Sequence, residues 1–332
     1  MKVLFIGGTG IISSACSELA IRHGIDLYTL NRGQSFRPTP EGAISLHADI
    51  RKPDSVTNVL GDLMFDAVVN WVAFTPDQVK TDLVLFRKRT KQYIFISSAS
   101  VYQKPPRYLP ITESTPLDNP FWQYSRDKAA CEALLEHAGV QEGFPFTIVR
   151  PSHTYDRTLL PFDGGYTTVA RMRAGKPVVV HGDGTSLWTM THHRDFAVGF
   201  LGLLGNPHAI GQSFHITSDE CLSWNQIYTI VGQAAGVEPQ LVHVPSELIA
   251  RYDPEWGDSL LGDKAHSMIF DNRKIRQFVP QFRPTIPFWQ GAREIIAWYD
   301  EDRSRQVVDP NVDGLQDQLI AAMMRALPEN KE

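Results

Sequence analysis

Short apolar runs alternate with helical segments through the first half of the chain, and this alternation is the feature that most constrains the fold. Each run has the length and the apolar content of a buried strand, and the segments between the runs have helical spacing. The runs lie at residues 3–6, 27–30, 67–72, 93–97 and 146–149. Such an alternation predicts βαβ units, and therefore a doubly wound parallel sheet of the α/β class.

The pattern of strands and helices changes near residue 151. Beyond this point, loops rich in glycine and proline separate shorter elements. Helical stretches continue, as at residues 224–235 and in an amphipathic tail at 315–326. We therefore expect a doubly wound domain over residues 1–152, to which residues 188–205 return, and a smaller mixed α/β domain over 153–332.

Composition excludes several classes of protein. The 332 residues carry a net charge of -5 and contain no long basic run, so nucleic acid is not an expected partner. Three isolated cysteines, Cys16, Cys131 and Cys221, fit a reduced compartment. The apolar start is too short for a signal peptide, and no stretch reaches membrane-spanning length. These observations predict a cytoplasmic protein without membrane partners.

The stretch GGTGIIS follows the first predicted strand and precedes a helix. In a dinucleotide site, glycines at such a turn let the backbone approach a pyrophosphate, which sits on the free N–H groups of the helix. Gly7 and Gly10 fit this pattern, whereas Ser13 stands where a third glycine would allow close packing of helix and strand. Ser13 either loosens that packing or adds a hydroxyl near the phosphates. An ordinary strand-to-helix turn is the competing interpretation.

A second set of residues lies far from the glycines. Tyr124 and Lys128 are four residues apart on a predicted helix and therefore share one face. Ser97 and Ser98 end a buried strand, and open α/β sheets bind ligands at the carboxyl ends of their strands.

With these motifs together, the chain resembles the extended short-chain dehydrogenases/reductases of the NAD-dependent epimerase/dehydratase family. The resemblance runs from GGTG through SSASVY, YSRDK and RPSHTYD to GKPVVVHGDG, HHRDFA and FHITSDECLSW. It implies a Rossmann-type first domain and a second domain that mainly binds substrate. It also implies that Tyr124 is the general acid/base, that Lys128 binds the nicotinamide ribose and lowers the tyrosine pKa, and that Ser98 positions the reacting oxygen. Lowering a tyrosine pKa from about 10 to about 7 requires roughly 4 kcal/mol of phenolate stabilisation.

The resemblance places a nicotinamide cofactor along the strand ends. Asn31 and Arg32 stand where an NAD site has a carboxylate for the ribose 2′-hydroxyl, which favours NADP over NAD, because Arg32 can pair with a 2′-phosphate. The expected cofactor-binding residues are Gly7, Thr9, Gly10, Ile11, Ile12, Asn31, Arg32, Asp49, Ile50, Val72, Ala73, Tyr124, Lys128 and Pro151.

The substrate end departs from the family pattern. Relatives that act on nucleotide sugars carry an Arg after the GDG turn and an Asn in the RPSHTYD segment, but these positions are Trp188 and His153 here. Tryptophan cannot bind a diphosphate in a bidentate way, although it can stack on a sugar or a base. We therefore expect a carbohydrate-like substrate, with Ser98, Ser100, His153 and Trp188 as its contacts and no metal.

Three functions stay open. One is a sugar epimerase or dehydrogenase that uses tyrosine-assisted hydride transfer, and another is an NADP-dependent reductase of a non-nucleotide carbonyl or polyol. The third is a non-catalytic RNA- or protein-binding member of the fold. Dehydration is disfavoured because Ala99 and Ser100 replace the acidic pair of the dehydratases. By resemblance, a homodimer through helices near residues 77–88 and 124–137 is possible.

Overall fold

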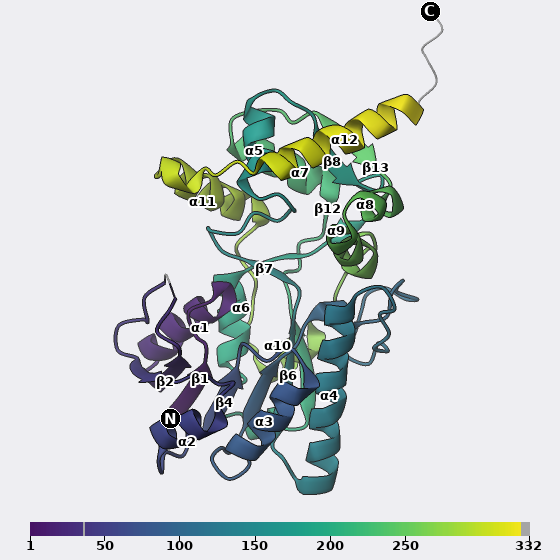
Figure 1. Cartoon of the computed structure of the whole chain (residues 1–332). Helices are drawn as coiled ribbons and strands as arrows, with labels where there is room; N and C mark the ends of the chain where they lie inside the picture. The colour runs from purple at the N-terminus through teal and green to yellow at the C-terminus, as the bar shows by residue number, and fades with distance from the viewer. Residues whose placement is uncertain (36, 327–332) are drawn as a thin grey trace, which may run out of the picture.

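A parallel sheet of seven strands forms the larger half of the molecule in the computed structural model, which describes residues 1–35 and 37–326 (Figure 1). The strand order is β11-β6-β5-β4-β1-β2-β3, and every neighbouring pair is parallel. The strands are β1 (Lys2–Ile6), β2 (Asp26–Asn31), β3 (Ile44–His47), β4 (Ala67–Asn70), β5 (Tyr93–Ile96), β6 (Phe146–Pro151) and β11 (Gln212–Ile216). The doubly wound α/β fold predicted from the sequence is confirmed.

Helices cover both faces of the sheet, which explains why its central strands are apolar throughout. Because side chains alternate along a strand, Val3 and Phe5 face one layer while Leu4 and Ile6 face the other. The first layer contains α1 (Ile11–Arg22), α6 (His193–Leu201) and α10 (Arg273–Phe278). The second contains α2 (Pro53–Leu60), α3 (Pro76–Phe86) and α4 (Gln123–Glu142). We call this half the sheet body.

The sheet differs from the sequence-based expectation at its edges. Strand β3 was not predicted, because Ile44, Ser45 and His47 are exposed and the segment has no buried apolar run. On the other side, β11 pairs along β6 and extends the sheet with a segment from the second half of the chain. Strand β4 ends at Asn70, two residues before the predicted end.

The remaining chain forms a second body with its own apolar core (Figure 1). Its three two-stranded sheets pair β7 (His153–Tyr155) with β10 (Met190–His192), β9 (Leu187–Trp188) with β12 (Leu222–Ser223), and β8 (Val178–His181) with β13 (Leu241–Val244). Its helices are α5 (Tyr166–Arg173), α7 (Trp224–Ala234), α8 (Ser246–Tyr252), α9 (Pro254–Ser259), α11 (Phe288–Asp300) and α12 (Pro310–Ala326). The predicted tail helix thus begins earlier, at Pro310, a residue suited to the first turn.

The carboxyl ends of the parallel strands lie along one edge of the sheet, and from there the chain leaves β6 to enter the second body through β7 (Figure 1). Short single turns complete the fold, at Ala99–Val101, Pro207–Ala209, Leu260–Lys264 and Arg303–Arg305. The first of these turns follows β5 directly and carries residues of the predicted active site.

Candidate active site

The glycine turn after β1 has the shape that a dinucleotide site needs. Gly7 and Gly8 have φ values of +100° and +101°, which other residues rarely adopt. A Cβ atom at Gly7 would lie 3.3 Å from side-chain atoms of Trp71 and Val72, so the space beside the turn also requires glycine. Helix α1 begins directly after Gly10 and presents its first N–H groups at this turn. Thr9, Ile11 and Ile12 lie on the same turn.

Ser13 is buried, and its hydroxyl accepts a hydrogen bond of 2.8 Å from the backbone N–H of Gly10. Ser17, one turn later, donates to the carbonyl of Gly8 at 2.9 Å. The Ser13 hydroxyl therefore lies at the start of α1 and ties the helix to the glycine turn. The turn fits the pyrophosphate of a dinucleotide, since its glycines have the φ values of a tight turn and the first N–H groups of α1 follow it.

The residues predicted for the adenosine end lie at the neighbouring strand ends. The side chain of Asn31 accepts a hydrogen bond from the N–H of Gly33, whereas Arg32 is exposed and forms no hydrogen bond or ion pair with the described residues. Asp49 accepts from the N–H of Arg51, and the Arg51 guanidinium donates to the carbonyl of Val72 at 2.6 Å. The structure thus brings Asp49 and Val72 together through an arginine that the prediction did not include. Ile50 and Ala73 are buried beside them, and Pro151 ends β6.

Lys128 lies between the ends of β4 and β5. Its ammonium group donates to the carbonyls of Ala73 and Ile96, both at 2.7 Å, and burial lowers its pKa to about 8. The ammonium nitrogen is 5.8 Å from the centre of the Tyr124 ring, on the same face of α4, as the four-residue spacing predicts.

The Tyr124 hydroxyl does not have the lowered pKa that the sequence analysis expects. Burial raises its pKa, the charge of Asp263 raises it further, and a hydrogen bond with Ser98 lowers it. The Lys128 ammonium, 5.8 Å from the ring centre, donates its hydrogen bonds to two backbone carbonyls, so that its effect on the tyrosine stays a prediction. The tyrosine ring also packs against Trp122, with ring centres 4.8 Å apart.

The two adjacent serines point in different directions. Ser98 is partly exposed and shares a hydrogen bond of 2.9 Å with the hydroxyl of Ser100, which in turn accepts from Ser125 at 2.7 Å. Ser97 is buried and donates to the carboxylate of Glu132. The structure therefore places Ser98 toward Tyr124 and Ser97 in the core. Ser100, predicted to contact substrate, is only 2% exposed and contacts Ser98 instead.

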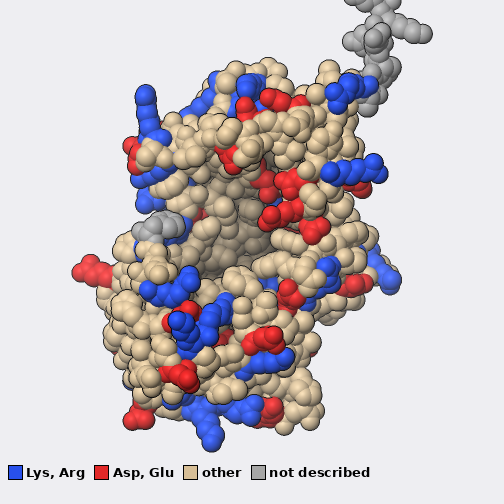
Figure 2. Space-filling view, in the orientation of Figure 1, with Lys and Arg blue, Asp and Glu red and all other residues tan. Residues whose placement is uncertain are grey.

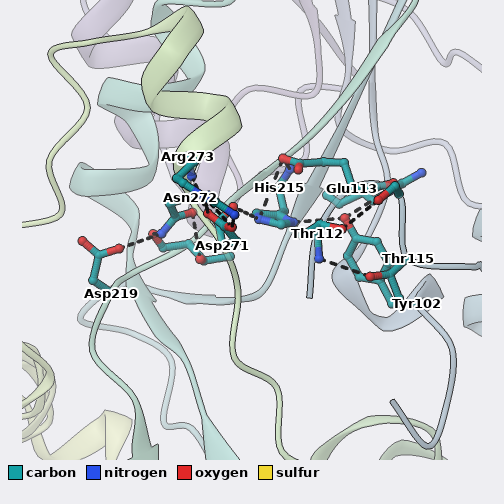
Figure 3. A network of polar contacts seen from close by, with 12 residues as sticks. Tyr102, Thr112, Glu113, Thr115, His215, Asp219, Asp271, Asn272 and Arg273 are labelled. Atoms are coloured by element: carbon teal, nitrogen blue, oxygen red, sulfur yellow. Dashed lines mark hydrogen bonds and ion pairs between the residues drawn. The ribbon is translucent and has the colours of Figure 1, made fainter. Parts of the chain in front are cut away.

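A buried polar network lies behind Ser97. Glu132 forms an ion pair of 2.5 Å with Arg150, and Arg150 donates to the hydroxyl of Tyr102 at 3.1 Å. The Tyr102 hydroxyl lies 3.1 Å from Nδ1 of His215, whose Nε2 donates to the carbonyl of Asp271 at 2.9 Å (Figure 3). The network connects the end of β5 with α4, β6 and β11.

Of the two predicted substrate contacts in the second body, Trp188 is buried and His153 is half-buried. His153 pairs with Met190 across β7 and β10, and burial lowers its pKa to about 3, so that it is neutral at pH 7. Trp188 is only 3% exposed and packs against Trp224, with ring centres 5.5 Å apart. Its ring is therefore part of the core and offers no open face for stacking. Within residues 1–35 and 37–326, no cluster of His, Cys, Asp and Glu could hold a metal ion.

A cavity of about 430 Å³ is lined in part by Trp122, whose ring packs against the ring of Tyr124 with ring centres 4.8 Å apart. Figure 2 shows a hollow between the two bodies, with acidic groups along the rim of the second body. Three carboxylates and one ammonium group line the cavity, and none of these carboxylates forms an ion pair with a described cation. Its lining residues are Trp122, Asp163, Gly164, Asp253, Glu255, Trp256, Ser259, Lys264, Val312, Leu315 and Gln316.

One carboxylate of this cavity, that of Asp163, has a raised pKa. Burial and the charge of Asp253 raise the pKa of Asp163, which Lys264 partly offsets. The sequence analysis missed these residues, because they come from four separate segments and form no motif.

Among the described residues, no helix is both long enough and apolar enough to span a membrane.

Comparison with known proteins identifies the family of this chain and several relatives. A model of the NAD-dependent epimerase/dehydratase family matches residues 3–217. The chain is 28% identical over 261 residues to the chloroplast stem-loop binding protein of 41 kDa b from Arabidopsis thaliana, covering 73% of this chain and 65% of that protein. It is 26% identical over 289 residues to the 2′-dehydrokanamycin reductase of Streptomyces kanamyceticus, covering 85% and 80%.

Among solved structures, the fold is similar to the UDP-glucose 4-epimerase of Bifidobacterium longum in complex with NAD+ and UDP. The TM-score is 0.73 at 19% identity, and the match covers 92% of this chain and all of that chain (100%).

Proposed function

Because this chain belongs to the NAD-dependent epimerase/dehydratase family, we propose that it is a nicotinamide-dependent enzyme that oxidises or reduces a carbon of a sugar-like substrate. The arrangement of Tyr124 and Lys128 carries this proposal. Both side chains lie at the carboxyl edge of the sheet, Tyr124 forms a hydrogen bond with Ser98, and the glycine turn that we assign to the dinucleotide follows β1 at the same edge.

In the proposed reaction, Tyr124 takes the proton of a substrate hydroxyl at its phenolic oxygen. Ser98 holds the same substrate oxygen by a hydrogen bond, while Ser100 and Ser125 orient Ser98. Lys128 contributes its positive charge below the tyrosine and binds the ribose of the cofactor. The bound nicotinamide supplies the acceptor for the hydride that leaves the carbon, and the reverse reaction reduces a carbonyl.

Two courses of the reaction differ in what happens to the cofactor. An epimerase would retain one cofactor molecule through oxidation and re-reduction of the same carbon, whereas a dehydrogenase or reductase would release it after each turnover. Incubation with NAD, NADP and a panel of sugars and amino sugars distinguishes them. Net coenzyme reduction identifies a dehydrogenase, and isomer exchange without net reduction identifies an epimerase. Absence of both would contradict the proposal and favour a non-catalytic binding protein, as the name of the Arabidopsis relative suggests.

A second observation favours a substrate without a nucleotide diphosphate. Among the described residues, the cavity beside Trp122 is lined by the carboxylates of Asp163, Asp253 and Glu255 and by one cation, Lys264. A diphosphate would be repelled there, while a polyhydroxylated molecule that bears ammonium groups would be attracted. The dehydrokanamycin for which the Streptomyces relative is named is of this chemical class. We therefore propose reduction or oxidation of an amino sugar as the favoured reaction.

This substrate class predicts weak binding of nucleotides. Calorimetric titration of the cofactor-loaded protein with UDP, dTDP and GDP is expected to give dissociation constants above about 1 mM, because a desolvated diphosphate finds no guanidinium partner. The double variant Asp163→Asn with Asp253→Asn should bind UDP more tightly than the wild type, because it removes two repelling charges. Micromolar binding of any nucleotide to the wild type would contradict the substrate class.

The coenzyme preference depends on Arg32. We expect NADP to bind more tightly than NAD, because the exposed Arg32 guanidinium is available for a 2′-phosphate. Arg32→Ala should weaken the binding of NADP by about 10- to 150-fold, because one charged hydrogen bond is lost. The affinity for NAD should stay within about twofold of the wild-type value. Fluorescence titration measures both, and Arg22→Ala on the exposed end of α1 is the control. Equal losses for the two coenzymes, or tighter binding of NAD to the wild type, would refute this assignment.

A further inference from the structure

Arg37 crosses from the segment after β2 to the second body. Its Nη1 atom lies 2.6 Å from a carboxylate oxygen of Asp156, and its Nη2 atom donates to the hydroxyl of Thr158 at 2.6 Å. The side chains of Arg37 and Asp156 are only 16% and 5% exposed. Asp156 also accepts hydrogen bonds from the backbone N–H and the hydroxyl of Thr158. The guanidinium is therefore held in a fixed position by the loop that follows β7.

The same guanidinium touches the first turn of α1. Nη1 lies 3.4 Å from the carbonyl oxygen of Gly10 and 3.4 Å from the hydroxyl of Ser14. A cation at a helix N-terminus opposes the helix dipole, so this position is unfavourable for the helix alone. It is favourable when a doubly charged pyrophosphate lies on the N–H groups of that turn, because a guanidinium has five N–H donors and can bridge the carboxylate of Asp156 and a phosphate oxygen.

We propose that Arg37 binds the pyrophosphate of the dinucleotide and that Asp156 positions it, so that this pair of side chains holds the cofactor against α1 and slows its release. This inference rests on the proposed function, because it requires a dinucleotide at the glycine turn. It gives Arg37 a role separate from that of Arg32. Arg32 distinguishes the two coenzymes at the 2′-position, whereas Arg37 acts on the pyrophosphate that both coenzymes share.

The test compares ligands with and without the pyrophosphate. Dissociation constants of NAD, NADP, ADP-ribose and adenosine are measured by calorimetry on the wild type and on Arg37→Ala. We expect the variant to bind the three pyrophosphate ligands about 10- to 150-fold more weakly, and adenosine within about twofold of the wild type. Arg173→Ala is the matched control, since it breaks an Arg–Asp pair of 2.7 Å in the second body and should change none of the four constants.

Two further variants examine the geometry. Arg37→Lys keeps the charge without the planar fork and should lose part of the affinity, and it serves in place of Arg37→Ala if that variant does not fold. Asp156→Asn should release the cofactor faster than the wild type in stopped-flow displacement, because the guanidinium is no longer positioned. Tighter cofactor binding by Asp156→Asn would show competition between Asp156 and the cofactor and would overturn the proposal.

The remaining outcomes separate this inference from the function on which it rests. If the wild type binds NAD or NADP and Arg37→Ala binds it equally well, Arg37 is not a phosphate ligand, while the proposed function stands. If Arg37→Ala also loses adenosine, Arg37 only maintains the local structure and the inference fails. If the wild type binds neither coenzyme, both the proposed function and the inference fail.

Discussion

Replacing Tyr124 by phenylalanine is expected to reduce turnover by at least about 100-fold and to leave cofactor affinity nearly unchanged. The change removes the phenolic oxygen that carries the proton, but it keeps the ring that packs against Trp122. The initial rate with a substrate from the sugar panel, and the dissociation constant of the coenzyme, measure the two effects. Tyr108→Phe is the control. It removes the same hydroxyl from a tyrosine that is 84% exposed, and it should leave both values unchanged.

Lys128→Met provides the contrast to this variant. Because the Lys128 ammonium bonds the ends of β4 and β5 and is expected to bind the cofactor ribose, its loss should lower both turnover and cofactor affinity. A Tyr124→Phe protein that kept more than about a tenth of the wild-type rate would show that another group transfers the proton. A Lys128→Met protein with unchanged cofactor affinity would remove the ribose contact from the proposed mechanism.

The second large effect is expected on stability, from the buried Glu132–Arg150 pair. Arg150→Met should lower the free energy of unfolding by about 3–5 kcal/mol, because it leaves the carboxylate of Glu132 charged and buried without its partner. Ser97 is then the only other described side chain that donates a hydrogen bond to this carboxylate. Denaturation in urea at pH 7, followed by circular dichroism, measures the change.

Two companion variants decide whether the unpaired charge is the cause. Arg150→Met combined with Glu132→Leu removes both charges and should recover most of the lost stability. Arg173→Met breaks the partly exposed pair with Asp300 and should cost less than about 1 kcal/mol. If Arg150→Met cost no more than Arg173→Met, the buried pair would not contribute as we describe.

Local patterns in the sequence predicted the sheet and part of the candidate site. Buried strands and the Gly7 turn depend on neighbouring residues, so their periodicity and composition are visible in one short window. The spacing of Tyr124 and Lys128 likewise needs only the geometry of one helix, and the structure places both at the carboxyl edge of the sheet. Their catalytic roles and that of Ser98 remain predictions.

Features that depend on distant residues could not be predicted in this way. Arg37 and Thr158 form a hydrogen bond across 121 positions of the chain, and no local pattern marks either residue. The carboxylates of the cavity also come from separate segments. The sequence analysis considers only the effect of nearby positive charge on the Tyr124 pKa. In the structure, burial of the phenol has the largest effect and raises this pKa. Strand β3 was not predicted, because this exposed edge strand contains no run of apolar residues.

The pairing of β11 with β6 has a consequence for the autonomy of the two bodies. Since residues 212–216 align with residues 147–151, a fragment that ended after β6 would leave an apolar strand with an open row of backbone donors and acceptors. A fragment intended to fold as the sheet body must therefore extend through residue 216. The chain from 152 to 211 thus begins and ends at neighbouring strands of one sheet, so that changes confined to its loops leave the pairing of β6 with β11 in register.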